Sequence, residues 1–149
     1  MENKDIFKHL EKLIQLDIDA CHAYDQAIEK IDELVVKEKL VLFKADHRRH
    51  VDVLSAKMAQ LGGTPPEFAK DFKGFFISGF TALRSLTGTG GALEAMETNE
   101  RLTNSSYEKA VKEDFPTDIA TTIRENYADE QRHLSFIREA LSRHHSVKH

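Results

Sequence analysis

The chain has 149 residues, of which 40% are hydrophobic and 31% charged, and its formal net charge is -4. This length favours one domain, and the composition excludes a disordered or fibrous chain. The interleaved acidic and basic residues argue against nucleic-acid binding, the single cysteine excludes an intrachain disulfide, and no apolar run is long enough to span a membrane.

The N-terminal half predicts a helical hairpin over about residues 3–61. Inward positions recur every three or four residues in two stripes, as in bundle helices. The first stripe comprises Ile6, Leu10, Leu13, Asp17, Ala20, Tyr24, Ala27, Ile31 and Leu34, and the second comprises Leu40, Phe43, His47, His50, Leu54, Met58 and Leu61. If Asp17 faces the two histidines, the chain reverses near Asp32 and Glu33. The first residues contain no apolar signal-peptide core, so we expect a cytoplasmic protein.

A crossover of about residues 62–91 is expected next. Gly62 and Gly63 end the second helix, and Thr64, two prolines and Glu67 predict the start of a short helix. The glycine-rich residues 87–91 are then expected to break the chain. A connector of this length can span the bundle, so the second and third long helices should run parallel. Its phenylalanines are expected to cap the bundle or to form a homodimer contact.

The C-terminal half predicts a second hairpin over about residues 92–143. One stripe comprises Leu93, Met96, Glu100, Thr103, Tyr107 and Ala110, and the other comprises Ile119, Ile123, Tyr127, Glu130, His133, Ile137 and Leu141. Pro116 disfavours helix just before it and marks the turn between them. Residues 1–149 are therefore expected to form one all-α domain, a four-helix bundle of two antiparallel hairpins with one long crossover that contains short helices.

The two hairpins repeat one polar pattern at a spacing of 83 residues. Asp17, Tyr24, His47 and His50 recur as Glu100, Tyr107, Glu130 and His133. Burying ionisable groups at the middle of a bundle is costly unless partners neutralise them. Three carboxylates and three imidazoles could surround one or two divalent transition metals. We therefore predict six metal ligands: Asp17, His47, His50, Glu100, Glu130 and His133.

An alternative is a bundle whose former metal site has become a hydrogen-bonded network. Tyr24 and Tyr107 are expected either to donate hydrogen bonds to a ligand carboxylate of the opposite hairpin, outside the ligands themselves, or merely to fill the core. Four charged residues recur beside the stripes, and we expect ion pairs on the surface or between helices from them: Asp46, Arg49, Asp129 and Arg132.

The second copy resembles a known half-site. Glu130-x-x-His133, with Glu100 on the preceding helix and Tyr107 seven residues after it, resembles the rubrerythrin-type half-site of the ferritin-like di-iron carboxylate superfamily. The chain as a whole resembles a bacterial ferritin-like family of unknown function, and the predicted connectivity is that of the ferritin-like bundle.

The resemblance implies a role for most of the predicted ligands. Asp17 and Glu100 would be terminal ligands, Glu130 would bridge two irons, and His50 and His133 would be nitrogen ligands. The first copy departs from the pattern at one position, because the residue equivalent to Glu130 is a histidine where a second bridging glutamate is expected.

This departure, His47, leaves the metal and its count open. Four carboxylates neutralise two divalent ions, whereas three leave one positive charge, which hydroxide or another anion could meet or a single metal could avoid. Two iron ions are the cofactor that the resemblance implies. Zinc and manganese are alternatives, and the histidine-rich set also suits cobalt, nickel or copper.

The leading hypothesis is a ferritin-like metal-binding protein with a dinuclear or mononuclear site in the bundle core. It would oxidise iron with oxygen or peroxide in metal homeostasis or stress defence, as a non-haem di-iron oxidoreductase of the ferroxidase or peroxidase type. The alternative is a non-enzymatic stress or assembly bundle with a structural zinc or vestigial site, which His47 and the absence of a Cys-x-x-Cys rubredoxin segment favour. A zinc hydrolase is a third alternative and needs an open coordination position.

Overall fold

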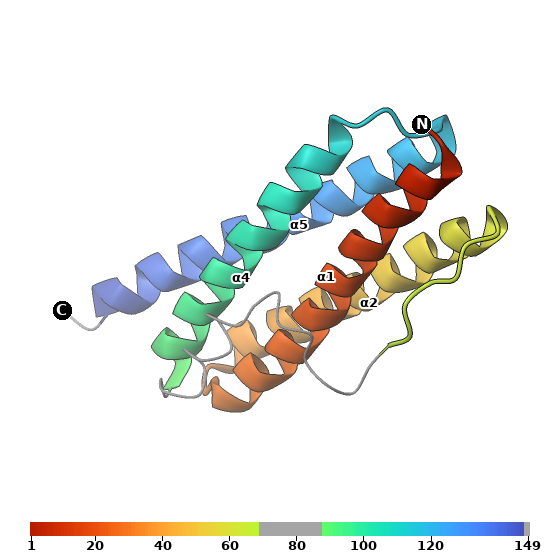
Figure 1. The fold of residues 1–149 in the computed structure, drawn as a ribbon. Coiled ribbons are helices and arrows are strands. Elements are labelled where there is room, and N and C mark those ends of the chain that lie inside the picture. Colours follow the sequence, from red (N-terminus) through yellow and green to blue (C-terminus); the bar gives the residue numbers. More distant parts are fainter. Residues whose placement is uncertain (69–87, 148–149) are drawn as a thin grey trace.

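Four long α-helices make up most of residues 1–68 and 88–147, the part of the chain that the computed structural model describes. They are α1 (Asn3–Lys30), α2 (Leu34–Gln60), α4 (Gly88–Val111) and α5 (Thr117–Val147). Helix α1 pairs with α2 and helix α4 pairs with α5 as two antiparallel hairpins (Figure 1). The predicted all-α four-helix bundle is confirmed.

The two hairpins pack side by side. Helix α1 also contacts α4, and α2 also contacts α5, so each described helix touches two neighbours. Helices α2 and α4 run in the same direction (Figure 1), as expected if one long crossover joins the hairpins. The prediction that a short helix starts at Thr64 is wrong for residues 64–68, which are not helical. The ring of Pro66 disfavours a helical conformation at Pro65. The rest of the predicted short helices and the phenylalanine-rich dimer contact fall on residues 69–87, outside the described residues.

The ends of the helices agree with the predicted turns. Residues 31–33 separate α1 from α2, and residues 112–116, which include Pro116, separate α4 from α5. Helix α2 ends at a glycine cap, because Gly62 adopts a φ of +89° and its N–H donates to the carbonyl of Ala59 at 3.0 Å. The N–H of Gly63 donates to the carbonyl of Met58 at 3.0 Å. This is the Schellman pattern, which needs a left-handed residue that glycine adopts without steric cost.

The prediction that glycines interrupt the chain over residues 87–91 is wrong for residues 88–91, since α4 begins at Gly88. Gly88 has a φ of +79° and so permits a sharp entry into the helix. Thr89 accepts a hydrogen bond from the N–H of Asp32 at 3.0 Å. A Cβ atom on Gly90 would lie 2.7 Å from Nε2 of His144 on α5. These glycines therefore allow close packing at the start of the helix instead of ending it.

Two large apolar clusters of described residues fill the bundle, one at each end. The cluster near residues 31–33 includes Ala27, Ile31, Leu40, Phe43, Leu93, Met96 and Ile137. The cluster at the other end includes Ile6, Leu10, Ile14, Leu54, Met58, Phe115, Ile119 and Ile123. Polar residues of all four helices are buried between them, at the middle of the bundle.

A few predicted inward positions differ from this pattern. Leu34 is 66% exposed at the first residue of α2, whereas Val36 in the same turn is buried. Tyr127 is only partly buried, whereas the preceding Asn126 is buried and donates a hydrogen bond to the hydroxyl of Tyr107 at 3.3 Å. Among the described residues, no helix combines the length and the hydropathy needed to cross a membrane.

Candidate metal centre

All six predicted ligands lie in the buried polar layer between the two apolar clusters. Helix α1 supplies Asp17, α2 supplies His47 and His50, α4 supplies Glu100, and α5 supplies Glu130 and His133. Each side chain is at most 1% exposed. The i, i+3 spacing of the pairs on α2 and α5 places both members of each pair on one helix face. The structure therefore brings together every residue in the predicted set.

The six residues form two overlapping groups of four. One group comprises Asp17, His47, His50 and Glu130, and the other comprises His47, Glu100, Glu130 and His133. In each group every residue offers one nitrogen or oxygen atom, and these atoms all lie within 4.8 Å of one another. His47 and Glu130 belong to both groups. The arrangement is that of a buried His/Glu/Asp cluster consistent with a dinuclear metal site.

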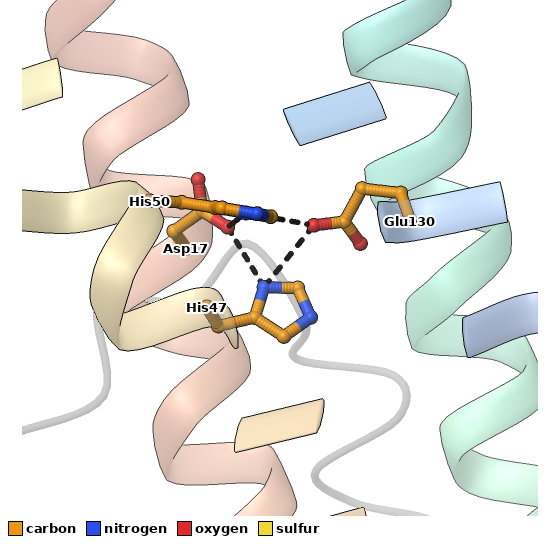
Figure 2. Close-up of side chains that lie close together, drawn as sticks. All are labelled: Asp17, His47, His50 and Glu130. Carbon is orange, nitrogen blue, oxygen red and sulfur yellow. Dashed lines mark hydrogen bonds and ion pairs between the residues drawn. The ribbon is translucent and has the colours of Figure 1, made fainter. Parts of the chain in front are cut away.

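In the first group, the side chains of Asp17, His47, His50 and Glu130 point toward one another (Figure 2). Oδ1 of Asp17 lies 2.7 Å from Nδ1 of His47 and 3.2 Å from Nδ1 of His50. Oε1 of Glu130 lies 3.4 Å from Nδ1 of His47 and 3.2 Å from Nδ1 of His50. Two oxygens and two nitrogens therefore converge from α1, α2 and α5.

In the second group, the two shared residues contribute their other donor atoms, Nε2 of His47 and Oε2 of Glu130. Nε2 of His47 lies 3.0 Å from Oε1 of Glu100. Nδ1 of His133 lies 3.4 Å from the same oxygen of Glu100 and 3.7 Å from Oε2 of Glu130. Here the donor atoms converge from α2, α4 and α5.

The three histidines share their protons with carboxylates. Burial alone lowers the pKa of His47, but Glu130 and Glu100 outweigh it and raise that pKa to about 9. Burial also lowers the pKa of His50, whereas the nearby charge of Asp17 and a hydrogen bond to Asp129 raise it to about 12. Without bound metal, both imidazoles therefore remain protonated at neutral pH.

The carboxylates respond in the opposite direction. Burial raises the pKa of Asp17, but the charges and hydrogen bonds of His50 and His47 outweigh it, and the pKa lies below the ordinary value. Burial likewise raises the pKa of Glu100, and His47 and His133 bring it well below its ordinary value. Divalent metal ions could replace the histidine protons as the positive charge at these carboxylates.

Several atoms of the cluster lack hydrogen bonds although they are buried. They are both carboxylate oxygens of Glu130 and Nδ1 of His133. Buried polar atoms without a hydrogen-bond partner are rare in proteins, and a metal ion is one of the groups that can satisfy them. The donor set of imidazole nitrogens and carboxylate oxygens suits a first-row divalent metal. The residues present therefore fit a metal pair.

Two buried tyrosines connect the hairpins at the cluster. The hydroxyl of Tyr24 on α1 donates to Oε1 of Glu100 on α4 at 2.5 Å. Reciprocally, the hydroxyl of Tyr107 on α4 donates to Oδ2 of Asp17 on α1 at 2.6 Å. These are hydrogen bonds of the kind expected from the sequence, each to a carboxylate of the opposite hairpin. Thr103 donates to Oε2 of Glu100 at 3.1 Å and so holds the other oxygen of that carboxylate.

Two aspartates have a closer role than the ion pairs expected from the sequence. Oδ2 of Asp129 lies 2.9 Å from Nε2 of His50, and Oδ2 of Asp46 lies 2.8 Å from Nε2 of His133. Each aspartate thus holds the outer nitrogen of a histidine on the opposite hairpin. Carboxylates in this position orient a metal-binding imidazole and raise its basicity.

Two arginines complete this outer arrangement. Arg49 contacts Asp129 and donates to Oδ1 of Asp46 at 3.0 Å. Arg132 donates to Oδ1 of Asp129 at 2.7 Å and to Oδ2 of Asp46 at 3.3 Å. The ion pairs between helices that the sequence predicted are therefore present. In the sequence, only the repeat pointed to these contacts with His50 and His133: Asp46 directly precedes His47, and Asp129 directly precedes Glu130.

The sequence matches a family model, and the fold matches solved structures. The family model described as "Domain of unknown function (DUF2383)" matches residues 5–113. No curated protein matches the sequence.

Solved structures of the same fold come from several bacteria. A bacterioferritin-related protein from Bacteroides fragilis, described as a dodecameric thioferritin, has a TM-score of 0.82 at 15% identity over 99% of this chain and 90% of its own. A conserved hypothetical protein from Mycobacterium tuberculosis has a TM-score of 0.79 at 11% identity, over 95% and 100%. A structure described as ferritin-like, diiron-carboxylate proteins from Bacillus anthracis has a TM-score of 0.73 at 20% identity, over 95% and 99%. At these identities the likeness shows a shared ferritin-like fold.

Proposed function

The chain belongs to the family described as a domain of unknown function, DUF2383, and from this premise we propose that it binds a pair of divalent metal ions in the core of its ferritin-like bundle. The observation that carries the proposal is the pair of overlapping groups of four buried donor residues, which meet at one level of the bundle. Buried charge of this density needs compensating partners, and two cations supply them.

The donor set divides between the two ions. Asp17 and His50 would bind one ion, Glu100 and His133 would bind the other, and Glu130 would lie between them, since its two oxygens face different groups. Iron is the metal that we propose first, by resemblance to the ferritin-like di-iron proteins, with zinc or manganese as alternatives.

The surrounding residues are suited to hold such a site in one geometry. Tyr24 and Tyr107 fix the orientation of a carboxylate on the opposite hairpin, and Asp46 and Asp129 fix two imidazole rings. Burial between two apolar clusters excludes bulk water. A redox-active metal pair bound there would supply electrons and Lewis acidity for the reduction of oxygen or peroxide.

Metal analysis of protein purified without an affinity tag tests the site. We expect about two metal ions per chain in the wild type and a large loss in the double variant His50→Ala plus His133→Ala. The matched control is His144→Ala plus His145→Ala, which removes two histidines at the end of α5, away from the cluster, and should leave the metal content unchanged. Equal metal content in both double variants would refute the site.

A test of the proposed oxidase chemistry is separate. Protein loaded with ferrous iron is mixed with oxygen or peroxide in a stopped-flow spectrometer, and iron oxidation is followed by absorbance. Oxidation much faster than that of free ferrous iron, and lost in the variant of His50 and His133, is the expected result. Oxidation at the rate of free iron would leave a binding protein without ferroxidase activity.

The histidine-rich composition favours a second candidate function. Three imidazoles in the donor set suit zinc as well as iron, and zinc has no redox chemistry. In that case the protein is a non-enzymatic bundle whose metal pair stabilises the fold. Zinc in the protein as purified from cells grown with ample iron would support this candidate over the oxidase.

We also propose that the protein forms a homodimer. Four apolar side chains on α2 are exposed, which is a feature of surfaces that associate: Leu34, Val35, Val41 and Leu42. The related protein from Bacteroides fragilis is described as dodecameric. A monomer in analytical ultracentrifugation at micromolar concentration would contradict the dimer.

A further inference from the structure

We propose that His47 bridges the two metal ions as an imidazolate, with Nδ1 bound to one ion and Nε2 bound to the other. The inference rests on the proposed dinuclear site and concerns the one position at which this chain departs from the ferritin-like ligand pattern. His47 would then take the bridging role of the glutamate that the ferritin-like pattern has at this position.

The orientation of the ring is the first argument. His50 and His133 each direct Nδ1 into the cluster and Nε2 outward to an aspartate, Asp129 or Asp46. His47 has no such outer partner among the described contacts of its ring nitrogens. Its Nδ1 lies 2.7 Å from Asp17 and its Nε2 lies 3.0 Å from Glu100. In Figure 2 dashed lines join one ring nitrogen of His47 to Asp17 and Glu130, and none is drawn from the other ring nitrogen.

The position of His47 in the repeat is the second argument. His47 and Glu130 are equivalent residues of the two hairpins, because 130 − 47 equals the repeat spacing of 83. They are also the two residues that both groups of donors share. The two oxygens of Glu130 face different groups, and so do the two nitrogens of His47. The two equivalent positions of the repeat therefore each carry a side chain with two donor atoms, one for each group.

The distances are those of ligands around a common ion. Two donor atoms bound to one metal at about 2.0–2.2 Å are separated by roughly 3 Å when their bonds meet at tetrahedral or octahedral angles. Nδ1 of His47 lies 2.7 Å from Asp17 and 3.4 Å from Glu130, and Nε2 lies 3.0 Å from Glu100. Nδ1 is thus at ligand spacing from Asp17 and Glu130, and Nε2 is at ligand spacing from Glu100.

Charge is the third argument. Asp17, Glu100 and Glu130 carry three negative charges, one fewer than two divalent ions require. An imidazolate supplies the fourth. When the second ion binds, the remaining N–H bond of His47 breaks, the nitrogen binds the metal, and the proton passes to the buffer. Two neighbouring cations favour this loss, as they favour deprotonation of other metal-bound groups.

A bridging ring also has a structural consequence. The two ring nitrogens point away from each other, so an imidazolate holds its ions further apart than the roughly 3.5–4 Å typical of two-metal sites. Glu130 can still reach both ions, because its oxygens already face the two groups. The centre would therefore be wider than one with two bridging glutamates.

Nitrogen NMR of the zinc-loaded protein tests the bridge directly. The protein is labelled with 15N in its histidine rings and titrated with two equivalents of zinc, a diamagnetic probe. Ring signals are assigned from the variants His47→Gln, His50→Gln and His133→Gln. We expect His50 and His133 each to keep one protonated nitrogen, and His47 to have two metal-bound nitrogens and no N–H. A proton on either nitrogen of zinc-loaded His47 would overturn the bridge.

Zinc stoichiometry provides a second test that does not depend on assigning the spectrum. His47→Glu replaces the imidazolate with a carboxylate, the bridging anion found at the equivalent position, Glu130. This variant should retain two zinc ions per chain. His47→Gln is neutral and should weaken the second zinc site at least tenfold in a competition assay. Two zinc sites of unchanged affinity in His47→Gln would also overturn the bridge.

The two tests separate this inference from the proposed function. If two zinc ions bind and shift the Nδ1 signals of His50 and His133 while His47 keeps its N–H, the metal centre stands and the bridge fails. If zinc shifts none of these signals, the metal centre itself fails and the bridge with it.

Discussion

Asp46 and Asp129 show how one residue outside a cluster can set the chemistry of a residue within it. A hydrogen bond to an imidazole nitrogen fixes both the ring orientation and the nitrogen that stays free to bind metal. Burial raises the pKa of Asp46, but the hydrogen bond and charge of His133 and the hydrogen bond of Arg49 together outweigh it and lower the pKa to about 2. The carboxylate therefore remains an anionic acceptor throughout the physiological range.

Neutralising these aspartates should weaken metal binding without removing a ligand. For Asp46→Asn and Asp129→Asn we expect zinc affinity to fall by about 10–100-fold each, since losing such a partner leaves the ring free to turn. Competition with a chelating dye measures the affinity. Asp52→Asn is the matched control, because Asp52 lies on the exposed face of α2 beside Arg48. Equal affinities in all three variants would show that the aspartates are not needed to orient the rings.

Proton binding by the same cluster predicts how stability depends on pH in the metal-free protein. The pKa of His47 rises from 6.5 to about 9 and that of His133 to about 11, where burial opposes the shift and carboxylates outweigh it. The protonated histidines contribute their full stabilisation below pH 6.5, the ordinary pKa of histidine. This contribution is lost as the pH rises through their raised pKa values in the folded protein. The pKa values of Asp17 and Glu100 are lowered from 3.8 and 4.5. Their contribution to stability is therefore present above these values and is lost as the pH falls through the folded pKa values.

The unfolding temperature of metal-free protein should therefore be highest between about pH 4.5 and pH 6.5 and should fall toward pH 9. Zinc competes with the histidine protons, so the added stability of the zinc-loaded protein should increase over the same rise in pH. Differential scanning calorimetry of both forms measures the difference. A metal-free protein that becomes more stable from pH 6.5 to pH 9 would show that the histidines are neutral in the folded state.

At the scale of the helix, α2 is confined at both ends by local chemistry. It begins after the three-residue turn at 31–33 and ends at the glycine cap of Gly62. These limits set which turn of α2 lies at the middle of the bundle. His47 and His50 lie on that turn, so the helix ends position the cluster indirectly.

The cap gives a prediction for a single residue. Gly62→Ala should lower the free energy of unfolding by about 1–2 kcal/mol, because alanine at a φ of +89° is strained. No heavy atom lies within 4 Å of the added Cβ, so the loss would come from the backbone alone. Gly62→Asn should lose less, since asparagine adopts this conformation more readily. Urea unfolding measures both, and an equal loss in the two variants would contradict the backbone explanation.

At the scale of the whole molecule, the polar layer joins the two hairpins. Tyr24 reaches Glu100 and Tyr107 reaches Asp17, so each hairpin donates a hydrogen bond to a buried carboxylate of the other. The aspartate contacts with His50 and His133 cross in the same reciprocal manner between α2 and α5. Relative placement of the hairpins is thus coupled to the geometry of the site.

Removing the tyrosine hydroxyls tests this coupling. Tyr24→Phe and Tyr107→Phe should each reduce the stability of the metal-free protein by about 1.5–3 kcal/mol, the range for hydrogen bonds to charged groups. Tyr127→Phe, at a partly buried position, is the matched control and should change stability by less than about 0.5 kcal/mol. Chemical denaturation measures all three. Losses no larger than that of the control would show that the tyrosine hydroxyls do not hold the hairpins together.

The sequence by itself determined the helices, their inward faces and the candidate residues. Periodicity of three and four is a local property, and it placed Asp17, His47 and Glu130 on buried stripes. The turn at Pro116 and the cap at Gly62 also follow from local backbone preferences. The repeat spacing of 83 residues related the two half-sites before any contact between them was known.

Only the tertiary structure decided how the two half-sites combine. Contacts between Asp129 and His50, or between Glu100 and His47, join residues 79 and 53 positions apart, and they depend on the angle and depth at which the hairpins pack. Helical periodicity fixes the face on which a side chain lies, but it does not determine which atoms of another helix that side chain meets. For this reason the two inward nitrogens of His47 became apparent only in the assembled bundle.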